Sequence, residues 1–295
     1  MFIRRILISF VSFAMFASLI TPATARENLA SGTLQTPWLG SAYKSCSYPK
    51  GPAVVRPPNA ASWAEQGFGD VIKGIDVSRW NHPNNKAIDF KKVKETYGVT
   101  FVIIKSSDGG DKGNALAKKW YPIDRKAAKA QGLVVGGYHY ALPGNLAKDR
   151  TKDAKLQAAR AVRQANGAKV GDLPLTLDME ELPCGWTHAQ LAQWTDVFLK
   201  EVKRLTGRTP MIYMNGTFIK RIVGANVADF SEYPLWLAKW GPGLGTDPGD
   251  ASIWPGKWII WQFTADGKVS AVPSKNTDLN VFNGNREDFQ QFVNR

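Results

Sequence analysis

The sequence has few cysteines and few histidines, and this argues against a metal site or a catalytic thiol. Its 295 residues include two cysteines and three histidines. The histidines show no H-x-x-x-H or comparable spacing, and divalent metal sites in proteins usually recruit histidine. Neither cysteine lies in a Cys/His signature, so a catalytic thiol is not expected. We therefore predict no metal site and no cofactor.

Acidic residues are outnumbered by basic residues. The chain has 38 Lys and Arg against 25 Asp and Glu, a formal net charge of +13, which falls to +11 if residues 1–25 with their two arginines are removed. A basic exported protein suits a polyanionic surface such as cell wall, lipid headgroups or nucleic acid, although the charge can also serve solubility alone. The basic residues are scattered and no DNA- or RNA-binding signature is present, so nucleic acid is not an expected partner.

Long apolar runs are absent except for one at the start of the chain. Residues 6–20 are apolar, Arg4 and Arg5 precede them, and the small-residue motif Ala-Thr-Ala follows at 23–25. This order is that of a secretory signal peptide, and the run is short for a membrane span. We predict export to the extracellular space or periplasm, a mature chain that begins at Arg26, and no stable membrane insertion. A retained anchor is the alternative.

The two cysteines, Cys46 and Cys184, form an even pair. In an oxidising compartment such a pair indicates a disulfide, and two buried free thiols are the alternative. The bond would tie the N-terminal extension to the loop just after Glu180. Closing so long a loop stabilises a protein by roughly 3–5 kcal/mol in the chain-entropy model.

The chain divides into three parts by composition. Residues 1–25 are the predicted signal peptide, and residues 26–70, rich in Pro, Gly, Ser and Ala, are expected to form an irregular extension packed on the domain. Residues 71–295 are expected to form one barrel domain. No internal repeat or separate wall-binding module is present, and we expect a monomer.

Strand and helix patterns alternate along the main domain. Strands are predicted at 71–78, 100–105, 133–141, 173–181, 209–215, 234–240, 258–264 and 278–282. Helices are predicted at 89–97, 115–130, 147–166, 187–205 and 217–223, with Asp89 and Thr187 near helix starts and Gly132 and Gly207 after helix ends. The fold class is therefore α/β: a modified TIM-like parallel barrel with five β/α units followed by three helix-poor strands.

Acidic residues stand at the ends of predicted strands, where barrel enzymes carry their active residues. Asp76 ends the first strand, and Asp178 and Glu180 end the fourth. Side chains alternate along a strand, so Asp178 and Glu180 would share one face, and two acids that close would raise the pKa of one of them. Glycoside hydrolysis needs such a proton donor beside an anion. An acidic strand end that runs into a solvated loop is the alternative.

Several ordered stretches resemble the glycoside hydrolase family 25 lysozymes of the Chalaropsis type. The likeness covers about residues 71–285 and leaves out the first 70 residues. The matching stretches are 74–78 (GIDVS) with Trp80, 101–105 (FVIIK), 137–140 (GYHY), 177–180 (LDME), 212–213 (IY), 234–238 (PLWLA), 261–262 (WQ) and 278–280 (DLN).

This resemblance implies a muramidase that cuts the β-1,4 bond between N-acetylmuramic acid and N-acetylglucosamine in peptidoglycan glycan strands. It implies that Glu180 is the general acid and Asp178 the stabilising carboxylate, with Asp76 and Asp278 in the remaining acidic positions. The attack on the anomeric carbon can come from the substrate's own acetamido group, from a carboxylate, or from water in an inverting route.

Aromatic residues at the ends of inner strands are candidates to stack on sugar rings, with ordinary core packing as the alternative. They are Tyr138, Tyr140, Tyr213, Trp236, Trp240 and Trp261. His139 would point away from Tyr138 on a regular strand, so a structural role is favoured for it.

One position departs from the family pattern. Where the family usually carries a glutamate after its second strand, this sequence has Asp108, which leaves the substrate contacts of that loop open. Rival functions are a metal-dependent polysaccharide hydrolase and a catalytically inactive wall-binding protein on the same barrel. The same chemistry used by a secreted toxin against competing bacteria would differ in biological use alone.

Overall fold

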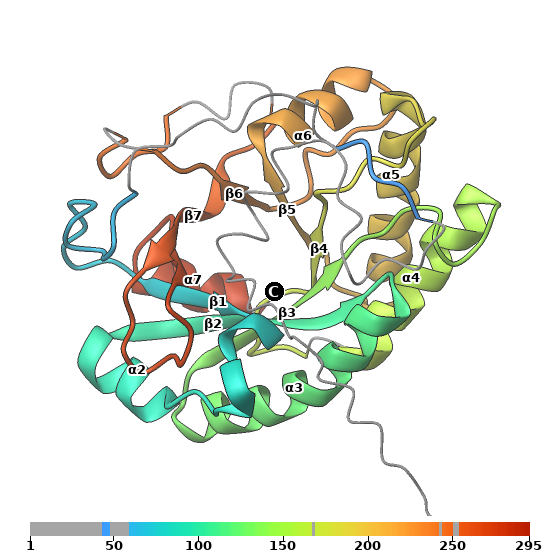
Figure 1. Cartoon of the computed structure of the whole chain (residues 1–295). Helices are drawn as coiled ribbons and strands as arrows, with labels where there is room; N and C mark the ends of the chain where they lie inside the picture. Colours follow the sequence, from blue (N-terminus) through green and yellow to red (C-terminus); the bar gives the residue numbers. More distant parts are fainter. Residues whose placement is uncertain (1–42, 48–58, 167–168, 242–243, 250–253) are drawn as a thin grey trace, which may run out of the picture.

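Eight β-strands close into a barrel in which each strand pairs with the next and β8 pairs with β1 (Figure 1). This computed structural model describes residues 43–47, 59–166, 169–241, 244–249 and 254–295. The predicted signal peptide and most of the predicted extension lie outside these residues. The closed barrel with helices around it confirms the predicted α/β class.

Helices follow each of the first five strands. The strands are β1 (Lys73–Val77), β2 (Val99–Asp108), β3 (Val134–Tyr140), β4 (Thr176–Asp178), β5 (Met211–Asn215), β6 (Leu235–Ala238), β7 (Trp258–Gly267) and β8 (Thr277–Phe282). The α-helices are α2 (Phe90–Tyr97), α3 (Asp111–Ala130), α4 (Arg150–Gln164), α5 (His188–Thr206), α6 (Gly216–Ile222) and α7 (Arg286–Val293). Short 3-10 helices lie at Arg79–Asn81, Pro83–Asn85 and Val223–Ala225. The five predicted β/α units are therefore present.

Strand β8 runs against its two neighbours, whereas all other neighbouring strands are parallel. The alternating pattern predicted a parallel barrel, and this reversed strand is a difference from that prediction. The reason lies in the connection: β7 ends at Gly267 and β8 begins at Thr277, so a short loop joins them. A parallel pair needs a crossover of a dozen or more residues, while an antiparallel pair does not.

Two helices begin and end at the residues that the sequence indicated. The Asp89 side chain accepts from the Lys92 backbone at the start of α2, and Thr187 forms a capping box with Gln190 at the start of α5. Helix α5 ends at Gly207, whose φ of +72° lies in the left-handed region that favours glycine. These signals act within one helical turn, which is why sequence alone reveals them.

Helix α7 was not predicted. Asn285 caps it in a capping box with Asp288, and its Phe289 ring lies 5.7 Å from that of Phe101 and 5.0 Å from that of Phe282, between ring centroids. Phe282 ends the antiparallel strand β8, so α7 closes the barrel at the end opposite the carboxyl ends of the parallel strands. Figure 1 shows α7 behind the barrel in that view.

Residues 59–70 pack against the outer side of β7 and β8. The Trp63 indole donates to the backbone oxygen of Asn280 at 2.9 Å, and the Phe68 ring contacts Phe263 edge-on at 5.2 Å. These aromatic side chains bury the side of the sheet where, in the described part of the chain, no α-helix follows β6 or β7. Among the described helices, none combines the length and the apolar character needed to cross a bilayer.

Candidate active site

Four acidic residues lie at one end of the barrel. Asp76 stands near the end of β1, Asp178 ends β4, and Glu180 follows two residues later. Asp278 stands near the start of β8, but because β8 is antiparallel, its start lies at the carboxyl ends of the other strands. The register pairs Asp278 directly with Asp76. The structure thus brings the predicted acids to the catalytic end of a barrel of this type.

Asp76 is a buried carboxylate held by two side-chain amides. It is 4% exposed, and its Oδ2 accepts from Gln262 Nε2 at 2.7 Å and from Asn280 Nδ2 at 2.9 Å. The oxygen atoms of these amides accept in turn from ring groups: Trp236 Nε1 donates to Asn280 at 2.8 Å, and the Tyr213 hydroxyl donates to Gln262 at 2.9 Å. Asp76 therefore anchors a network that crosses the barrel interior.

The indole groups determine which side-chain atoms donate and which accept in this network. An indole N–H can only donate, so the Asn280 oxygen must face Trp236 and its amide nitrogen must face Asp76. Trp240 Nε1 orients Gln262 in the same way, at 3.2 Å from Oε1. Gln262 and Asn280 were not among the predicted site residues, although both are polar residues that alternate with apolar neighbours on inner strands.

Asp178 and Glu180 follow one another at the mouth of the barrel. Asp178 lies between Tyr140 of β3 and Tyr213 of β5 in the strand register and is 6% exposed. Between the two acids, Met179 is fully buried in the outer core. Glu180 is half-buried. A half-buried carboxyl group beside a buried one has access to a ligand while remaining shielded from bulk water.

Tyr140 lies among three carboxylates. Its hydroxyl donates to Glu181 Oε1 at 2.6 Å. Burial raises the pKa of Tyr140 well above its ordinary value, and the negative charges of Glu181, Glu180 and Asp178 raise it further. Asp178 and Glu180 therefore both act electrostatically on the same hydroxyl. The Tyr140 hydroxyl, predicted to contact substrate, is used within the protein.

Three predicted aromatic residues pack together inside the barrel. Tyr213 and Trp236 are 4% and 2% exposed, and their rings meet edge-on with centroids 4.6 Å apart. Tyr138 is half-buried and lies 6.3 Å from the Trp236 ring centroid. Of these three, Tyr138 offers the most accessible ring to a ligand, while Tyr213 and Trp236 support the Asp76 network.

Trp261 does not belong to this cluster. It pairs in register with Leu237, whose side chain is in the outer core, and it packs edge-on against Phe68 with centroids 5.7 Å apart. The side chain is 0% exposed, and its indole donates to the backbone oxygen of Lys239. Trp261 therefore faces outward from the barrel, and the prediction that it contacts substrate is corrected.

Both carboxylate oxygens of Asp108 have partners within the protein. Lys105 Nζ lies 2.6 Å from Oδ2, and the Gly110 backbone donates to Oδ1 at 2.7 Å. The residue is 4% exposed and pairs in register with Tyr140. These contacts fix the loop at the end of β2 beside the acidic region. A direct contact between Asp108 and substrate stays a prediction.

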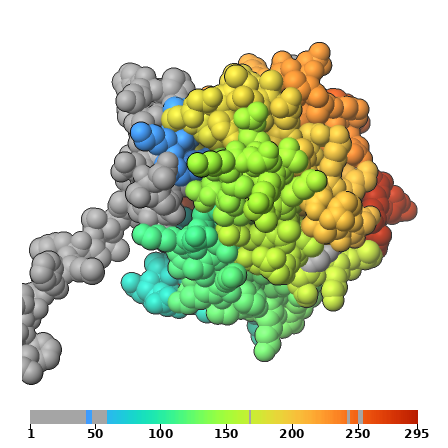
Figure 2. Space-filling view, turned by 90° about the vertical axis from the view of Figure 1, so that its right-hand side faces the viewer, coloured from blue at the N-terminus to red at the C-terminus, as the bar shows by residue number. Residues whose placement is uncertain are grey.

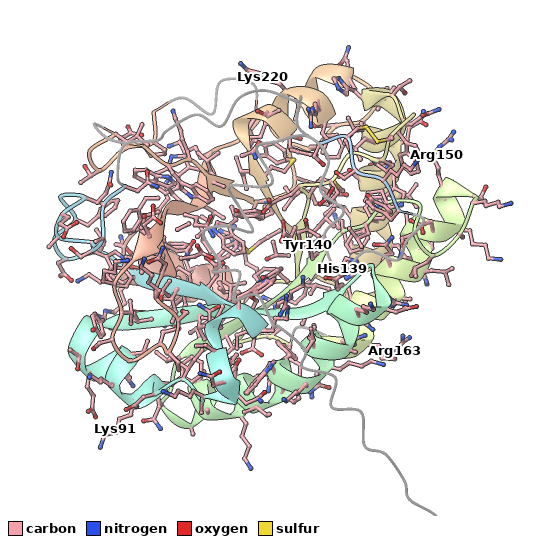
Figure 3. All side chains as sticks on the ribbon, viewed as in Figure 1. Lys91, His139, Tyr140, Arg150, Arg163 and Lys220 are labelled. Atoms are coloured by element: carbon pink, nitrogen blue, oxygen red, sulfur yellow. A yellow bond between two sulfur atoms is a disulfide. The ribbon has the colours of Figure 1, made fainter. Side chains whose placement is uncertain are left out.

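His139 is a structural residue, as the sequence analysis favoured. Its ring nitrogens lie 2.8 Å from the Ser107 hydroxyl and 3.0 Å from Gln157 Oε1. The side chain is fully buried, and burial lowers its pKa to about 4. Figure 3 labels His139 and Tyr140 as neighbours on β3.

Cys46 and Cys184 are joined by a disulfide in the structure. Residues 43–47 lie beside the turn that follows Glu180, where they form an isolated antiparallel bridge between Ser45 and Pro183. Figure 2 shows these residues, in blue, against the surface of the barrel. Part of the N-terminal extension therefore reaches the acidic end of the barrel.

The described residues include no group of three or more His, Cys, Asp or Glu side chains placed to hold a metal ion. What the site does offer is a half-buried acid, Glu180, next to the buried acid Asp178, with the carboxyl group of Asp76, held by two amides, across the barrel. A proton donor beside a stabilising anion is the arrangement that glycosidic bond cleavage uses.

Comparisons with known proteins agree with this geometry. The profile of the Glycosyl hydrolases family 25 matches residues 75–272. The chain is 31% identical over 231 residues to the YegX protein of Escherichia coli O157:H7, covering 76% of this chain and 74% of that protein. It is 30% identical over 203 residues to the N,O-diacetylmuramidase of Chalaropsis sp, covering 65% of this chain and 87% of that enzyme.

Solved structures of two lysozymes share the fold. The bacterial lysozyme from Streptomyces coelicolor superposes with a TM-score of 0.64 at 27% identity, covering 77% of this chain and 99% of that one. A family GH25 lysozyme from Aspergillus fumigatus gives a TM-score of 0.57 at 27% identity, covering 76% and 100%. With its fold, its family profile and its related sequences in agreement, the chain is a glycoside hydrolase and belongs to the glycosyl hydrolases family 25.

Proposed function

We propose that this protein is a 1,4-β-N-acetylmuramidase that hydrolyses the bond between N-acetylmuramic acid and N-acetylglucosamine in peptidoglycan. The observation that carries the proposal is the placement of Asp178 and Glu180 together at the strand carboxyl ends of a family 25 barrel. Relatives described as a lysozyme and an N,O-diacetylmuramidase support the choice of substrate.

In this proposal Glu180 is the general acid. Asp76 and Asp178 are buried, whereas Glu180 and Asp278 are half-buried. Of the two half-buried acids, Glu180 follows Asp178 by two residues, so it can reach the glycosidic oxygen of a glycan bound beside that carboxylate. It donates its proton to that oxygen as the bond to the anomeric carbon breaks. Without this proton the leaving group would depart as an alkoxide, and general acids contribute about 10²–10⁴-fold to such steps.

Asp178 supplies the stabilising negative charge. We favour attack by the acetamido oxygen of the substrate on the anomeric carbon, which forms an oxazolinium ion that Asp178 orients and stabilises. Water then opens the ring, and Glu180 removes a proton from that water. Asp76 and Asp278, paired across β1 and β8, add negative charge to the same end of the barrel. The configuration of the first sugar product distinguishes this retaining route from an inverting one.

We assign sugar binding to the aromatic residues at the carboxyl ends of the parallel strands. The half-buried ring of Tyr138 can stack on a sugar face, and the buried rings of Tyr213 and Trp236 hold it in place. Exposed basic side chains add a long-range attraction to the polyanionic wall. Four of them, Lys91, Arg150, Arg163 and Lys220, project from separate places on the molecule, so no single basic face is formed by these residues (Figure 3).

Digestion of purified peptidoglycan with mass analysis of the new reducing ends tests the proposal. Muramic acid at the reducing ends is the expected result. Glucosamine ends or released peptides would instead show another specificity. Activity that persists with a chelator separates this mechanism from a metal-dependent hydrolase, and any clearing at all excludes an inactive wall-binding protein.

We also propose that the protein is exported by cleavage of residues 1–25. The sequence pattern of these residues supports this, and the action of related lysozymes on cell walls fits it. N-terminal sequencing of secreted protein should begin at Arg26. Protein that retains residues 1–25 in the membrane fraction would show an anchor instead.

A further inference from the structure

The N-terminal segment formed by residues 43–47 is built into the turn that carries the acidic pair. Its backbone pairs with that turn: Cys46 N donates to Leu182 O at 2.7 Å, and Cys184 N donates to Lys44 O at 3.0 Å. The disulfide between Cys46 and Cys184 joins the same two stretches covalently. The segment precedes the part of the chain that matches the family profile, so it is an addition to the barrel.

Glu181 is the side chain through which this segment reaches the site. It is 1% exposed, and both of its oxygens accept hydrogen bonds from other parts of the chain. Tyr140 donates to Oε1 at 2.6 Å, and the Ser47 hydroxyl donates to Oε2 at 3.0 Å. Acceptance at both oxygens suits a carboxylate anion. A buried carboxylate is costly to leave unpaired, so these two donors are needed wherever Glu181 is ionised.

Ser47 holds the turn as well as the carboxylate. Its hydroxyl accepts from the Leu182 backbone at 2.9 Å and lies 2.6 Å from the Ser45 hydroxyl. One serine oxygen thus bonds both the side chain of Glu181 and the amide of the next residue. Ser47 is 3% exposed, so water cannot easily replace it.

Glu180 lies directly before this clamped residue. The backbone of Met179 is held on its other side by a bond from its N–H to Tyr213 O at 3.0 Å. Glu180 therefore sits on a short stretch that is fixed at Met179 and again at Glu181. Small displacements of a general acid are costly, because a shift of about 1 Å can lower the rate about 10²-fold.

From these contacts we infer that Glu181, gripped by Tyr140 and by Ser47 of the N-terminal segment, is a positioning residue that sets the placement of the general acid Glu180. The inference rests on the muramidase function proposed above. It makes residues 43–47 part of the catalytic framework of this enzyme. Glu181 itself does not touch substrate, since it is buried and bonded on both oxygens.

A second consequence concerns charge. The ionisable groups around Glu181 and its partner Tyr140 include Tyr43 of the segment, Asp178 and Glu180. Asp108 pairs in register with Tyr140 and binds Lys105, whose Nζ lies 4.4 Å from the Tyr140 ring centroid. Burial raises the pKa of Glu181 above its ordinary value, hydrogen bonds from Ser45, Tyr140 and Ser47 lower it in part, and the charge of Glu180 raises it again. The repulsion is mutual, so on the alkaline side of the activity profile an ionised Glu181 opposes loss of the proton from Glu180.

Two variants test the inference, each with a matched control. Ser47→Ala removes the clamp and keeps the charge of Glu181, whereas Glu181→Gln removes the charge and keeps the shape. Ser270→Ala deletes an exposed hydroxyl that bonds Tyr97, and Glu95→Gln neutralises an exposed glutamate on α2. For each protein we would measure kcat and KM on soluble peptidoglycan fragments over a range of pH, together with the thermal midpoint.

We expect both site variants to lose about 10- to 100-fold in kcat with KM within twofold of wild type, while the controls keep wild-type values. In Glu181→Gln, but not in Ser47→Ala, the alkaline limb should also move to lower pH. A purely structural role would lower the thermal midpoint and leave kcat and the pH profile unchanged. That result in both variants would overturn the inference.

Hydrogen exchange measured by mass spectrometry gives a readout that does not depend on activity. The amides of Leu182 and Cys184 should exchange faster in Ser47→Ala than in wild type, and the Ser270→Ala control should match wild type. If wild-type protein fails to cleave peptidoglycan, the proposed function is wrong. Hydrogen exchange still tests whether Ser47 holds the turn in that case. Unchanged protection of the Leu182 and Cys184 amides in Ser47→Ala would show that it does not.

Discussion

Asp76 on β1 and Asp278 on β8 are register partners across the junction that closes the barrel. They are 202 positions apart in the sequence, and they meet because β8 runs antiparallel to β1. The same junction carries Asn280, which donates to Asp76 at 2.9 Å. One reversed strand therefore supplies both an acid and an acid-orienting amide to the mouth of the barrel.

Glu180→Gln should abolish cell-wall clearing while leaving the fold intact. The amide keeps the shape of the side chain but cannot donate a proton as a carboxylic acid does, so a loss of at least about 10²-fold in kcat is expected. Turbidity assays on wall suspensions and circular dichroism measure the two properties. The matched control is Glu95→Gln on the exposed face of α2. If Glu180→Gln clears wall suspensions at the wild-type rate, Glu180 is not the general acid.

Gln262→Leu should weaken both the barrel and its activity. The substitution removes one donor to Asp76 and leaves the Tyr213 hydroxyl and the Trp240 indole without the acceptor they use now. Each buried polar group left unsatisfied costs about 1–3 kcal/mol, so urea unfolding should show a loss in that range or above it. Gln291→Leu, on the exposed side of α7, is the control and should change stability by about 0.5 kcal/mol or less. Equal free energies of unfolding for the two variants would show that the hydrogen bonds of Gln262 do not stabilise the barrel.

The native protein should resist thiol labelling at Cys46 and Cys184 until it is reduced. The bond closes a loop with a sequence separation of 138 residues. The chain-entropy model then predicts that replacing both cysteines by alanine lowers the free energy of unfolding by up to about 5 kcal/mol. Mass spectrometry after alkylation with and without reductant checks the pairing. Free labelling of the native protein would end the disulfide hypothesis.

Stability should fall as the pH drops below about 6.5, and His139 should account for part of the loss. Its folded pKa of about 4 lies below the ordinary value of 6.5 because the ring is buried. Between these values the unfolded chain binds a proton that the folded protein does not, so this contribution is complete above about pH 6.5 and is lost toward pH 4. The total is about 3 kcal/mol at 1.36 kcal/mol per pH unit.

Urea unfolding at several pH values, with His139→Gln compared with wild type, measures this contribution. The variant should show a smaller pH dependence in that window, whatever its absolute stability. His188→Gln, at the exposed start of α5, is the control and should keep the wild-type slope. An identical slope for wild type and His139→Gln would show that the His139 ring does not titrate as described.

Much of the fold was predictable because its signals are local. The caps of α2 and α5, the five β/α units, and the acids at the ends of β1 and β4 all follow from patterns within one turn or one strand. Helix α7 was missed although Asn285 and Asp288 form a capping box, because a helix of only eight residues shows little periodicity. Side chains alternate between the two faces of a strand, so Trp261 and Gln262 must face opposite ways. This alternation does not reveal which of the two faces inward.

The sequence by itself determined the α/β alternation, the helix ends and the identity of the acids, because backbone sterics and capping hydrogen bonds act between residues a few positions apart. Only the tertiary structure decided the direction of β8, the inward face of β7, and the hydrogen bond from Ser47 to Glu181 across 134 positions. These features arise when barrel closure brings distant segments into contact. No short stretch of sequence specifies such a contact, because its free energy comes from burying and pairing groups that meet only in the folded chain.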